Sequence, residues 1–245
     1  GMALQFSDST NYYRHPFIWG LGQDIFDKTG TKTNIASPKA IQGLEILRNF
    51  ALKEKVMPPG IAGMQSQTIW ELINSGLVAI FEGGNETART LMLAEKEGRI
   101  KPGTIELYPV AAPYAAPNQP GNFCTVGGFG VFKQKDVQKR KYAMEFARFL
   151  TNKTNGKAVK ASHYFPTRKS VGNLYIDDPY MTFLGRTLKY NRLDMFSPYE
   201  SDTQTIFQAM YQAIISGETP PKQAAQYAKK QFDEFIRQKQ VEQRR

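Results

Sequence analysis

The sequence predicts an α/β fold, and three observations support this class. Amphipathic segments with apolar residues at helical spacing alternate with short apolar runs of strand length. Glycine and proline clusters separate these segments and mark the turns between them. The chain has 245 residues, 41% of them hydrophobic, which is enough to bury a sizeable core in one large domain or two small ones. The last third of the sequence reads as helix alone.

The first long predicted helix spans residues 37–55 and carries signals at both ends. Ser37 can cap its N-terminus, and Pro38 suits the first turn. The sequence VMPPG then stops the helix. Apolar residues recur at helical spacing and form the expected buried face: Ala40, Ile41, Leu44, Leu47, Phe50 and Ala51.

A second helix is predicted over residues 65–75, with Gly76 as its C-terminal cap. Leu77–Phe81 is continuously apolar, which predicts a short strand buried on both faces. The apolar run stops at residues 82–86, where two glycines lie between two acids and an amide. Polar side chains just after the end of a buried strand indicate that a ligand binds there. Another helix follows and ends at Gly98.

The middle of the chain is predicted to hold two strands, a connector and a helix. Residues 104–113 form a strand that runs into a Pro- and Ala-rich connector at residues 109–121. Residues 122–133 form a strand broken by three glycines, a pattern that often marks close approach by a backbone or a ligand. It is neither a Walker phosphate loop nor a full dinucleotide fingerprint. The helix over residues 136–152 is expected to point four residues inward: Ala143, Phe146, Ala147 and Leu150.

Three helices are predicted for the C-terminal third, over residues 178–191, 201–217 and 219–238. Ser201 or Asp202 is the expected cap of the second of these helices, and Gly217 is its stop. The third begins with Thr219 and Pro220, and the tail beyond it is expected to fray.

Composition excludes several functions. Cys124 is the sole cysteine, so no intramolecular disulfide can form, and with two histidines in the chain a cysteine-based zinc site is excluded. We expect no metal and no cofactor. No apolar run approaches the roughly 20 residues that span a bilayer, and the first twenty residues do not form a signal peptide. Gly1 before Met2 is typical of a tag-cleavage remnant, so native N-terminal sequence is expected to be missing.

The net charge of +10 raises the question of an anionic partner. The charge is interpreted as spread along the chain, with local excess at Lys133–Lys141 and near the C-terminus. There is no recognition motif rich in arginine and aromatic residues. A solvated basic surface is the favoured interpretation, and no nucleic-acid partner is expected. A nucleic-acid binder would instead show steeply salt-dependent DNA binding.

Five segments carry a resemblance to a known family. They are FIWGLGQDIFDKTGTKTNIASPKAIQGLEILRNFALKEKVMPP, ELINSGLVAIFEGGNE, TVGGFGVFKQKDVQKRKYAMEFARFLTN, FPTRKSV and AIISGETPPKQAAQYAKKQ. In this order they resemble the C-terminal part of extracellular solute-binding proteins of ABC importers, in the sugar-binding branch that includes maltose-binding protein. The resemblance covers about residues 13–236. Each motif is weak alone, and their shared order argues against chance.

The resemblance implies a periplasmic-binding-protein-like fold, with two α/β lobes joined by hinge crossovers and a ligand bound in the cleft between them. It implies that this chain holds one nearly complete lobe and part of the other, without the N-terminal half of the family's fold. Residues 1–110 are expected to form a second-lobe α/β segment. Residues 111–168 are expected to form the hinge and the returning first-lobe segment. Residues 169–245 are expected to return to the second lobe as helices with a frayed tail.

The implied function is binding of a solute, a carbohydrate, for ABC-transporter uptake. Closure of the cleft would do this without chemistry, so we expect no enzyme activity, and the partner in the intact family is an ABC permease. The implied location is extracytoplasmic, in the periplasm or as a cell-surface lipoprotein, although this chain shows no export signal. An incomplete lobe leaves apolar surface uncovered, which predicts self-association or a compensating rearrangement.

The candidate ligand-binding residues follow from the resemblance and from the chemistry of sugars. Carboxylates and amides can bridge adjacent hydroxyls, and aromatic rings stack on the C–H face of a pyranose. The candidates are Tyr13, His15, Trp19, Glu82, Asn85, Glu86, Gly127, Gly128 and Tyr199. Maltose-binding protein has an aromatic residue near the position of Asn85, where this chain has none.

Several of these candidates also have an alternative interpretation without ligand. Tyr13 and Trp19 can be core residues rather than stacking platforms, since aromatic side chains are mostly buried. Asn85 can serve as a cap for the following helix. Gly127 and Gly128 can form a bulge rather than a backbone approach to ligand.

Two further functions remain as alternatives. The first is a truncated lobe fragment that folds or self-associates and binds no solute. The second is a carbohydrate-active enzyme, which needs two carboxylates about 5–9 Å apart. Glu82 and Glu86 can come close in space, but nothing in the sequence enforces that geometry. No nucleophile elbow, metal triad or Ser-His-Asp pattern is present.

Overall fold

The computed structural model describes residues 1–7, 14–106, 122–124, 126–193 and 197–243. The chain divides into two compact units, and its path crosses between them four times. Unit 1 comprises Gly1–Glu82, Val110–Cys124 and Tyr190–Arg245, and unit 2 comprises Gly83–Pro109 and Thr125–Lys189. The predicted connector at residues 109–121 lies outside the described residues, and the lobe boundaries near residues 110 and 168 stay predictions.

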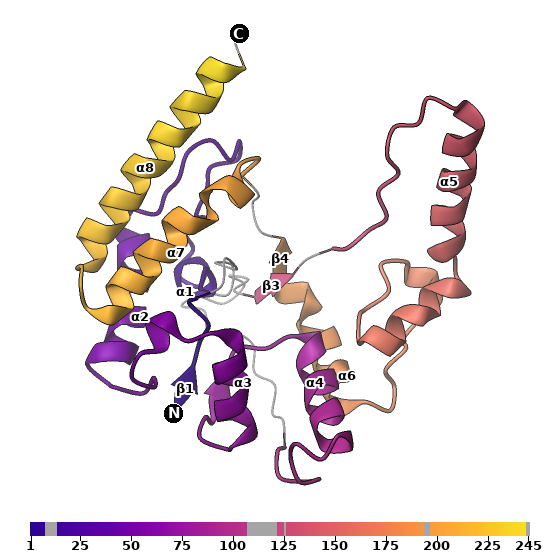
Figure 1. Cartoon of the computed structure of the whole chain (residues 1–245), viewed down its shortest axis with the longest axis horizontal. Helices are drawn as coiled ribbons and strands as arrows, with labels where there is room; N and C mark the ends of the chain where they lie inside the picture. Colours follow the sequence, from indigo (N-terminus) through magenta and orange to yellow (C-terminus); the bar gives the residue numbers. More distant parts are fainter. Residues whose placement is uncertain (8–13, 107–121, 125, 194–196, 244–245) are drawn as a thin grey trace. The chain divides into compact units, whose positions relative to one another are not determined.

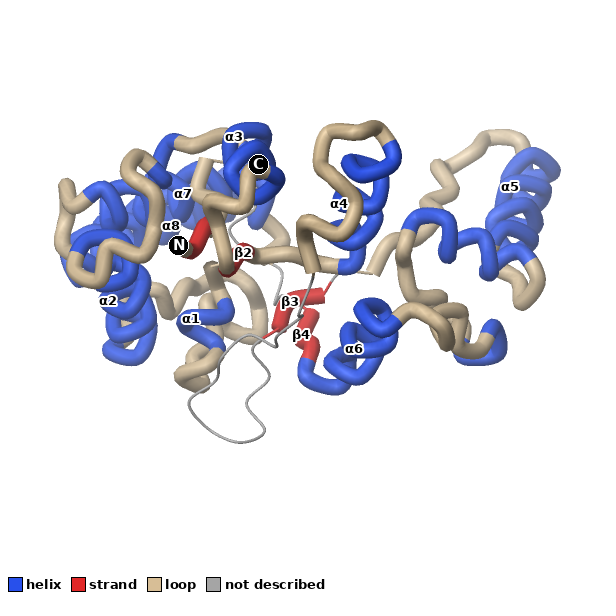
Figure 2. Tube along the Cα trace, turned by 90° about the horizontal axis from the view of Figure 1, so that it is seen from below, coloured by secondary structure: helices blue, strands red, loops and turns tan. Residues whose placement is uncertain are grey.

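Unit 1 contains two parallel strand pairs and most of the long helices. β1 pairs with β2 in the register Met2↔Ile80 and Ala3↔Phe81, and β3 pairs with β4 in the register Asn122↔Asn191 to Cys124↔Leu193. Parallel pairing needs long crossovers, and helices form much of them (Figures 1 and 2). This is the α/β class that the sequence predicts. The elements are β1 Met2–Ala3, α1 Pro16–Trp19, α2 Pro38–Leu52, η2 Ile61–Gly63, α3 Ser66–Asn74, β2 Ile80–Phe81, β3 Asn122–Cys124, β4 Asn191–Leu193, α7 Glu200–Ser216 and α8 Pro221–Glu242.

The core of unit 1 lies where α2, α7 and α8 pack together, and α7 and α8 run side by side in Figure 1. At its centre the Phe232 ring lies 5.5 Å from the Phe26 ring and 6.0 Å from the Phe207 ring. The N-cap of α7 is Tyr199, two or three residues before the predicted caps Ser201 and Asp202. Gly217, with φ of 88°, ends α7 as predicted. α8 buries one stripe along its length: Pro221, Ala224, Ala225, Ala228, Phe232 and Ile236.

Helix α2 forms as its end signals predict. The Ser37 hydroxyl accepts a hydrogen bond from the Ala40 amide at 3.3 Å, which caps the helix. Ala40, Leu44 and Leu47 are buried as expected, whereas the other three predicted core residues are partly exposed. Gly43 joins this face because a Cβ there would lie 2.6 Å from the Phe17 carbonyl oxygen. The sequence analysis missed this close approach of α1 and α2.

The predicted strand at Leu77–Phe81 is shorter and more exposed than expected. β2 spans only Ile80–Phe81, and the side chains of Leu77 and Ile80 are 67% and 59% exposed. The prediction of a strand buried on both faces is therefore wrong, although Val78 is buried. The reason is that β2 pairs only with a two-residue strand among the described residues, so no broad sheet forms there. The helix before it, α3, and the positive φ of Gly76 (69°) agree with the prediction.

Unit 2 is helical in its described part. Its elements are α4 Asn85–Lys96, α5 Val137–Leu150, η3 Asn155–Ser162, η4 Lys169–Val171 and α6 Pro179–Thr187, and η5 Leu188–Tyr190 follows at the unit boundary. α4 packs against α6, and α5 contacts η3. Carboxylates cap two of the helices: Asp136 accepts from the Gln138 and Lys139 amides, and Asp178 accepts from the Met181 amide.

Three predictions for unit 2 need correction. α5 has no buried residue, and the ring of Phe146 is 61% exposed, so the expected inward face is not covered. The physical reason is that, among the described residues, the main packing partner of α5 is the short η3 segment. Residues 104–106 and 126–133 are not strand, so the predicted glycine-rich strand shrinks to β3.

None of the described helices is both long and apolar enough to cross a bilayer.

Candidate functional site

The carboxyl ends of β1 and β2 lie at one edge of unit 1, because the two strands are parallel. Gln5 and Ser7 follow β1, and Glu82 follows β2. The Gln5 amide donates to Glu82 Oε1 at 2.7 Å, and its side-chain amide contacts the Ser66 hydroxyl. In open α/β sheets ligands bind outside the carboxyl ends of the strands. We call this group of residues, with the glutamines and arginine described next, the carboxyl-edge cluster.

Two glutamines of α7 reach this edge. Gln212 Nε2 donates to the Phe6 carbonyl at 3.1 Å and to the Ala62 carbonyl at 3.0 Å, and Gln208 Nε2 donates to the Ser7 carbonyl. Neither residue was predicted from the sequence. A signal was present, since Gln204, Gln208 and Gln212 recur every four residues and therefore share one face, and the other residues from Ile206 to Ile215 are apolar.

Arg14 is a third residue that was not predicted, and it is almost wholly buried. Its guanidinium carbon lies 5.1 Å from the centroid of the Phe6 ring, a cation–π contact that brings a positive charge beside the chain leaving β1. Arginine is rarely buried without a function or a set of partners. The carboxyl-edge cluster therefore combines a carboxylate, side-chain amides and, beside Phe6, a buried cation.

His15 and Trp19 form part of the unit 1 interior. Their rings meet edge to face at 5.2 Å, and Trp19 is 1% exposed. In this structure the Trp19 ring offers no face to solvent, which is the core alternative considered above. Tyr13, the third predicted residue of this segment, lies outside the described residues.

The two glycines after Glu82 have a steric reason that the sequence did not reveal. A Cβ on Gly83 would lie 2.4 Å from Thr87 Oγ1, and a Cβ on Gly84 would lie 2.8 Å from Glu86 Oε2. The Thr87 hydroxyl folds back to accept from the Gly84 amide at 3.0 Å, which satisfies a backbone donor at the start of α4. The glycine pair therefore makes room for the side chains of the first helical turn.

Asn85 and Glu86 open helix α4 in unit 2. The cap position is Gly84, so the alternative that Asn85 caps the helix is wrong. Asn85 Nδ2 is buried and has no hydrogen-bond partner among the described residues, so it is a donor available to a bound oxygen. Glu86 is exposed in the first turn, where its charge is favourable to the helix dipole.

Tyr180 of α6 fixes the same corner of unit 2. Its hydroxyl donates to the Gly84 carbonyl at 2.9 Å. Burial raises the pKa of the Tyr180 phenol, the Thr87 hydroxyl lowers it, and the carboxylates of Glu86 and Asp178 raise it further. The phenol therefore stays protonated and keeps its role as a donor at neutral pH.

The remaining predicted residues have different surroundings. Gly127 and Gly128 are exposed, and a Cβ on either would meet nothing within 4 Å, so no close backbone approach explains them in this structure. Tyr199 packs edge to face on Phe235 at 5.8 Å, and its hydroxyl accepts from Gln243 Nε2 at 3.1 Å. It thus holds the start of α7 against α8. Among the described residues no three acidic, histidine or cysteine side chains gather as a metal site.

Comparison with known proteins assigns the family. Residues 2–182, well over half of the chain, match the family model described as bacterial extracellular solute-binding protein. The chain therefore belongs to the family of bacterial extracellular solute-binding proteins. No curated protein sequence matched the chain.

Solved structures show the same periplasmic-binding-protein-like fold. Maltose-bound MalE3 of T. maritima superposes with a TM-score of 0.71 at 19% identity, covering 96% of this chain and 60% of that one. A putative oligosaccharide periplasmic-binding protein from Synechococcus sp. MITs9220 gives 0.72 at 17% identity, covering 98% and 62%. UgpB of Mycobacterium tuberculosis, in complex with glycerophosphocholine, gives 0.68 at 18% identity, covering 98% and 58%. The chain therefore spans about 60% of the length of these proteins.

Proposed function

We propose that this chain binds a polar solute, a carbohydrate, for uptake by an ABC importer, and that the carboxyl-edge cluster supplies part of the binding site. The observation that carries the proposal is the convergence of a carboxylate, side-chain amides and a buried guanidinium at the carboxyl ends of two parallel strands. Such planar groups suit adjacent hydroxyls, because each can donate to or accept from two of them.

The ligands of structures with a similar fold support the proposed class of solute. Structures of similar fold hold maltose, maltotetraose and α-D-tagatose, and one holds glycerophosphocholine. All of these ligands are rich in hydroxyl or other oxygen groups. We further propose that an ABC permease is the partner. The binding step involves no chemical reaction, because neither binding nor release of a solute requires a covalent bond to break.

The test is the melting temperature of the chain against a panel of mono- and oligosaccharides and glycerophosphodiesters. A ligand at about 100 times its dissociation constant stabilises by about 2.7 kcal/mol, which raises the melting temperature by roughly 5–10 °C for a chain of this size. A shift with one class of compound supports solute binding and identifies the class. A flat panel contradicts binding by this chain and favours the alternative of a lobe fragment that binds no solute.

Two glutamate-to-glutamine substitutions distinguish an effect at the candidate site from the general effect of removing a negative charge. Glu82→Gln removes the charge at the strand edge and should weaken binding roughly 10- to 100-fold, the usual loss for a hydrogen bond to a charged group. Glu218→Gln makes the same change at an exposed position after α7 and should leave the affinity unchanged. Equal affinities of both variants would contradict a role for Glu82. Release of a modified ligand would contradict binding without chemistry.

A further inference from the structure

Three segments of unit 1 that are far apart in the sequence meet at the carboxyl ends of β1 and β2. They are the chain that leaves β1, the chain from η2 to the start of α3, and helix α7. Residues 4–7 and 64–65 lie outside helices and strands, so no strand ladder or helix fixes them. Their positions therefore depend on hydrogen bonds from other parts of unit 1.

Gln212 of α7 joins the first two of these segments with one side chain. Its Nε2 lies 3.1 Å from the Phe6 carbonyl oxygen and 3.0 Å from the Ala62 carbonyl oxygen, and it donates to both. Both distances are those of ordinary N–H···O hydrogen bonds. A side-chain amide carries two hydrogens on its nitrogen, so both donors of Gln212 are engaged with backbone and neither is left for a solute.

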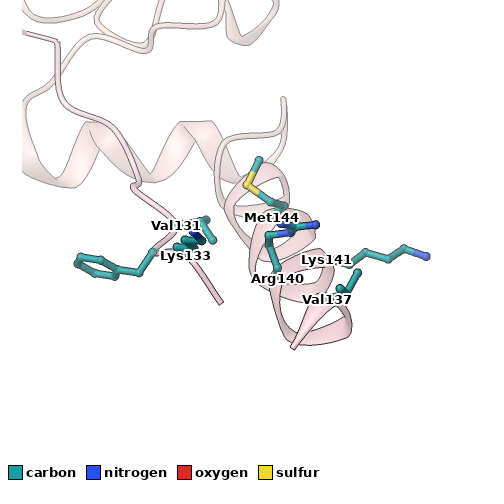
Figure 3. A pocket seen from close by; sticks show the side chains of 7 residues that line it. Val131, Lys133, Val137, Arg140, Lys141 and Met144 are labelled. Atoms are coloured by element: carbon teal, nitrogen blue, oxygen red, sulfur yellow. The ribbon is translucent and has the colours of Figure 1, made fainter. Parts of the chain in front are cut away.

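Helix α5 of unit 2 shows the opposite arrangement of a long polar side chain. A hollow of about 380 Å³ adjoins α5 and the segment before it, and Figure 3 shows Lys141 extending away from Val131 and Lys133. No ion pair holds Lys141 among the described residues. A lysine side chain that nothing fixes samples many rotamers, so this hollow defines no position for a ligand. Gln212, in contrast, has a fixed geometry.

The chain that leaves β1 in turn orients Glu82. Phe6, whose carbonyl oxygen Gln212 holds, is wholly buried and directly follows Gln5. The Gln5 backbone amide donates to Glu82 Oε1 at 2.7 Å, and the Gln5 side chain contacts the Ser66 hydroxyl. A hydrogen bond to an ionised carboxylate is stronger than one between neutral groups, and it holds the carboxylate in one orientation. Gln212 therefore acts on Glu82 through one short stretch of backbone.

Two neighbouring contacts complete this arrangement. Gln208, one turn before Gln212 on α7, donates to the Ser7 carbonyl, and the Ser7 hydroxyl donates to the Met64 carbonyl. The chain that leaves β1 is thus held at two successive carbonyls from α7 and is also tied to the segment after η2. A segment that is already held in place loses little conformational entropy when a solute binds beside it.

We propose that Gln212 is a positioning residue of the solute site. It touches no solute, and it holds the chain that leaves β1 so that the Gln5 amide orients the Glu82 carboxylate. This role rests on the proposed function, because Glu82 is the solute contact that Gln212 serves. A contact that is oriented before binding raises the affinity, since no entropy is lost in ordering it. Without Gln212 the carboxylate is still present but is free to turn.

The test compares two substitutions of Gln212 in the 245-residue chain by isothermal titration with maltose, maltotetraose and glycerophosphocholine. Gln212→Met keeps the length of the side chain and removes both donors, so it should weaken binding roughly 10-fold, the upper range for a lost hydrogen bond. Gln212→Lys keeps donors that can reach the two carbonyls and should bind within about threefold of the unchanged chain. Recovery with lysine but not with methionine identifies the donors as the cause.

A matched control and a measurement without solute accompany this test. Gln226→Met and Gln226→Lys make the same changes at an exposed position of α8 and should leave the affinity unchanged. Hydrogen exchange of the Gln5 backbone amide reports its bond to Glu82 directly. Gln212→Met should speed this exchange roughly 10-fold, whereas the Leu44 amide inside α2 should change little. A merely structural role of Gln212 would speed exchange at both amides alike.

A double-mutant cycle tests the route through Glu82. Once Glu82→Ala has removed the carboxylate, adding Gln212→Met should cost little further affinity, because both act on the same contact. Losses that multiply would overturn this route. Solute binding that Gln212→Met leaves unchanged, or unchanged exchange at Gln5, would overturn the role of Gln212 and leave the proposed function standing. Faster exchange at Gln5 in a chain that binds none of the three compounds would support the hold of Gln212 on Gln5 and contradict the proposed function.

Discussion

Helices α5 and α8 have similar sequence patterns, but only α8 buries its apolar side. Each carries apolar residues at helical spacing and several lysines and arginines. α8 buries its stripe against α7 and α2, and Phe232 is 0% exposed, whereas α5 buries no residue at all. Periodicity therefore shows which side of a helix is apolar, but not whether another part of the chain covers it. The coverage is a tertiary property, and it decides what each apolar side chain contributes to stability.

The largest expected difference is between the two central phenylalanines. Phe232→Ala should destabilise unit 1 by about 3–5 kcal/mol, because it leaves a cavity between the Phe26 and Phe207 rings. Phe146→Ala should change the free energy of unfolding by no more than about 0.5 kcal/mol, since its ring is mostly in solvent. Denaturant unfolding followed by circular dichroism measures both. Similar losses for the two variants would mean that α5 is covered in solution.

Gly43→Ala tests how closely unit 1 is packed. Its Cβ would lie 2.6 Å from a backbone oxygen of α1, which cannot move away as a flexible side chain can. The substitution should cost about 1–3 kcal/mol, although alanine is otherwise the better helix residue. The matched control is Gly63→Ala at the end of η2, where a Cβ meets nothing within 4 Å. A neutral Gly43→Ala variant would show that α1 and α2 separate easily.

Ser37→Ala and Tyr180→Phe compare one polar contact in each unit. Ser37→Ala removes the cap of α2 and should cost about 1 kcal/mol. Tyr180→Phe removes the hydrogen bond to the Gly84 carbonyl and should cost about 0.5–1.5 kcal/mol. Hydrogen exchange of the α2 amides and the α4 amides should report each loss in its own unit. Loss of protection in both units from either change would argue that they unfold as one.

The smallest expected effect concerns pH. Slight burial raises the pKa of Asp27, but hydrogen bonds from Thr29, Lys32 and Thr31 and the charge of Lys32 bring it below the ordinary value of 3.8. A carboxyl with a lowered folded pKa stabilises above its unfolded value, and this contribution disappears as the pH falls through the folded pKa. Asp27→Asn should therefore reduce stability slightly at neutral pH and have no effect in strong acid. NMR titration of Asp27 checks the direction, and a midpoint above 3.8 would contradict it.

The parts of the fold that local chemistry determines were predictable. Ser37, Gly76 and Gly217 mark helix ends by their own hydrogen bonding or backbone angles, and the structure places them as expected. Leu77–Phe81 and the inward side of α5 failed because burial needs a partner that sequence pattern does not name. At the candidate site the role of Glu82 as a strand-end residue was predictable, and it stays a proposal as a ligand contact.

Residues that act from distant parts of the chain could not be found in the same way. Gln212 reaches Phe6 only because the fold brings distant segments together, and Arg14, although close to Phe6 in sequence, lies over its ring only in the folded chain. The glycine pair after Glu82 looked like a loop built for a ligand, and its steric cause became visible only with the side chains of Glu86 and Thr87 in place.

The bond between Gln212 and the Phe6 carbonyl spans 206 positions of sequence. The segment that leaves β1 is thus synthesised long before the helix that it contacts. Contacts between distant residues slow folding, because a long loop must close before they form. Unit 1 cannot complete its core until α7 and α8 have left the ribosome.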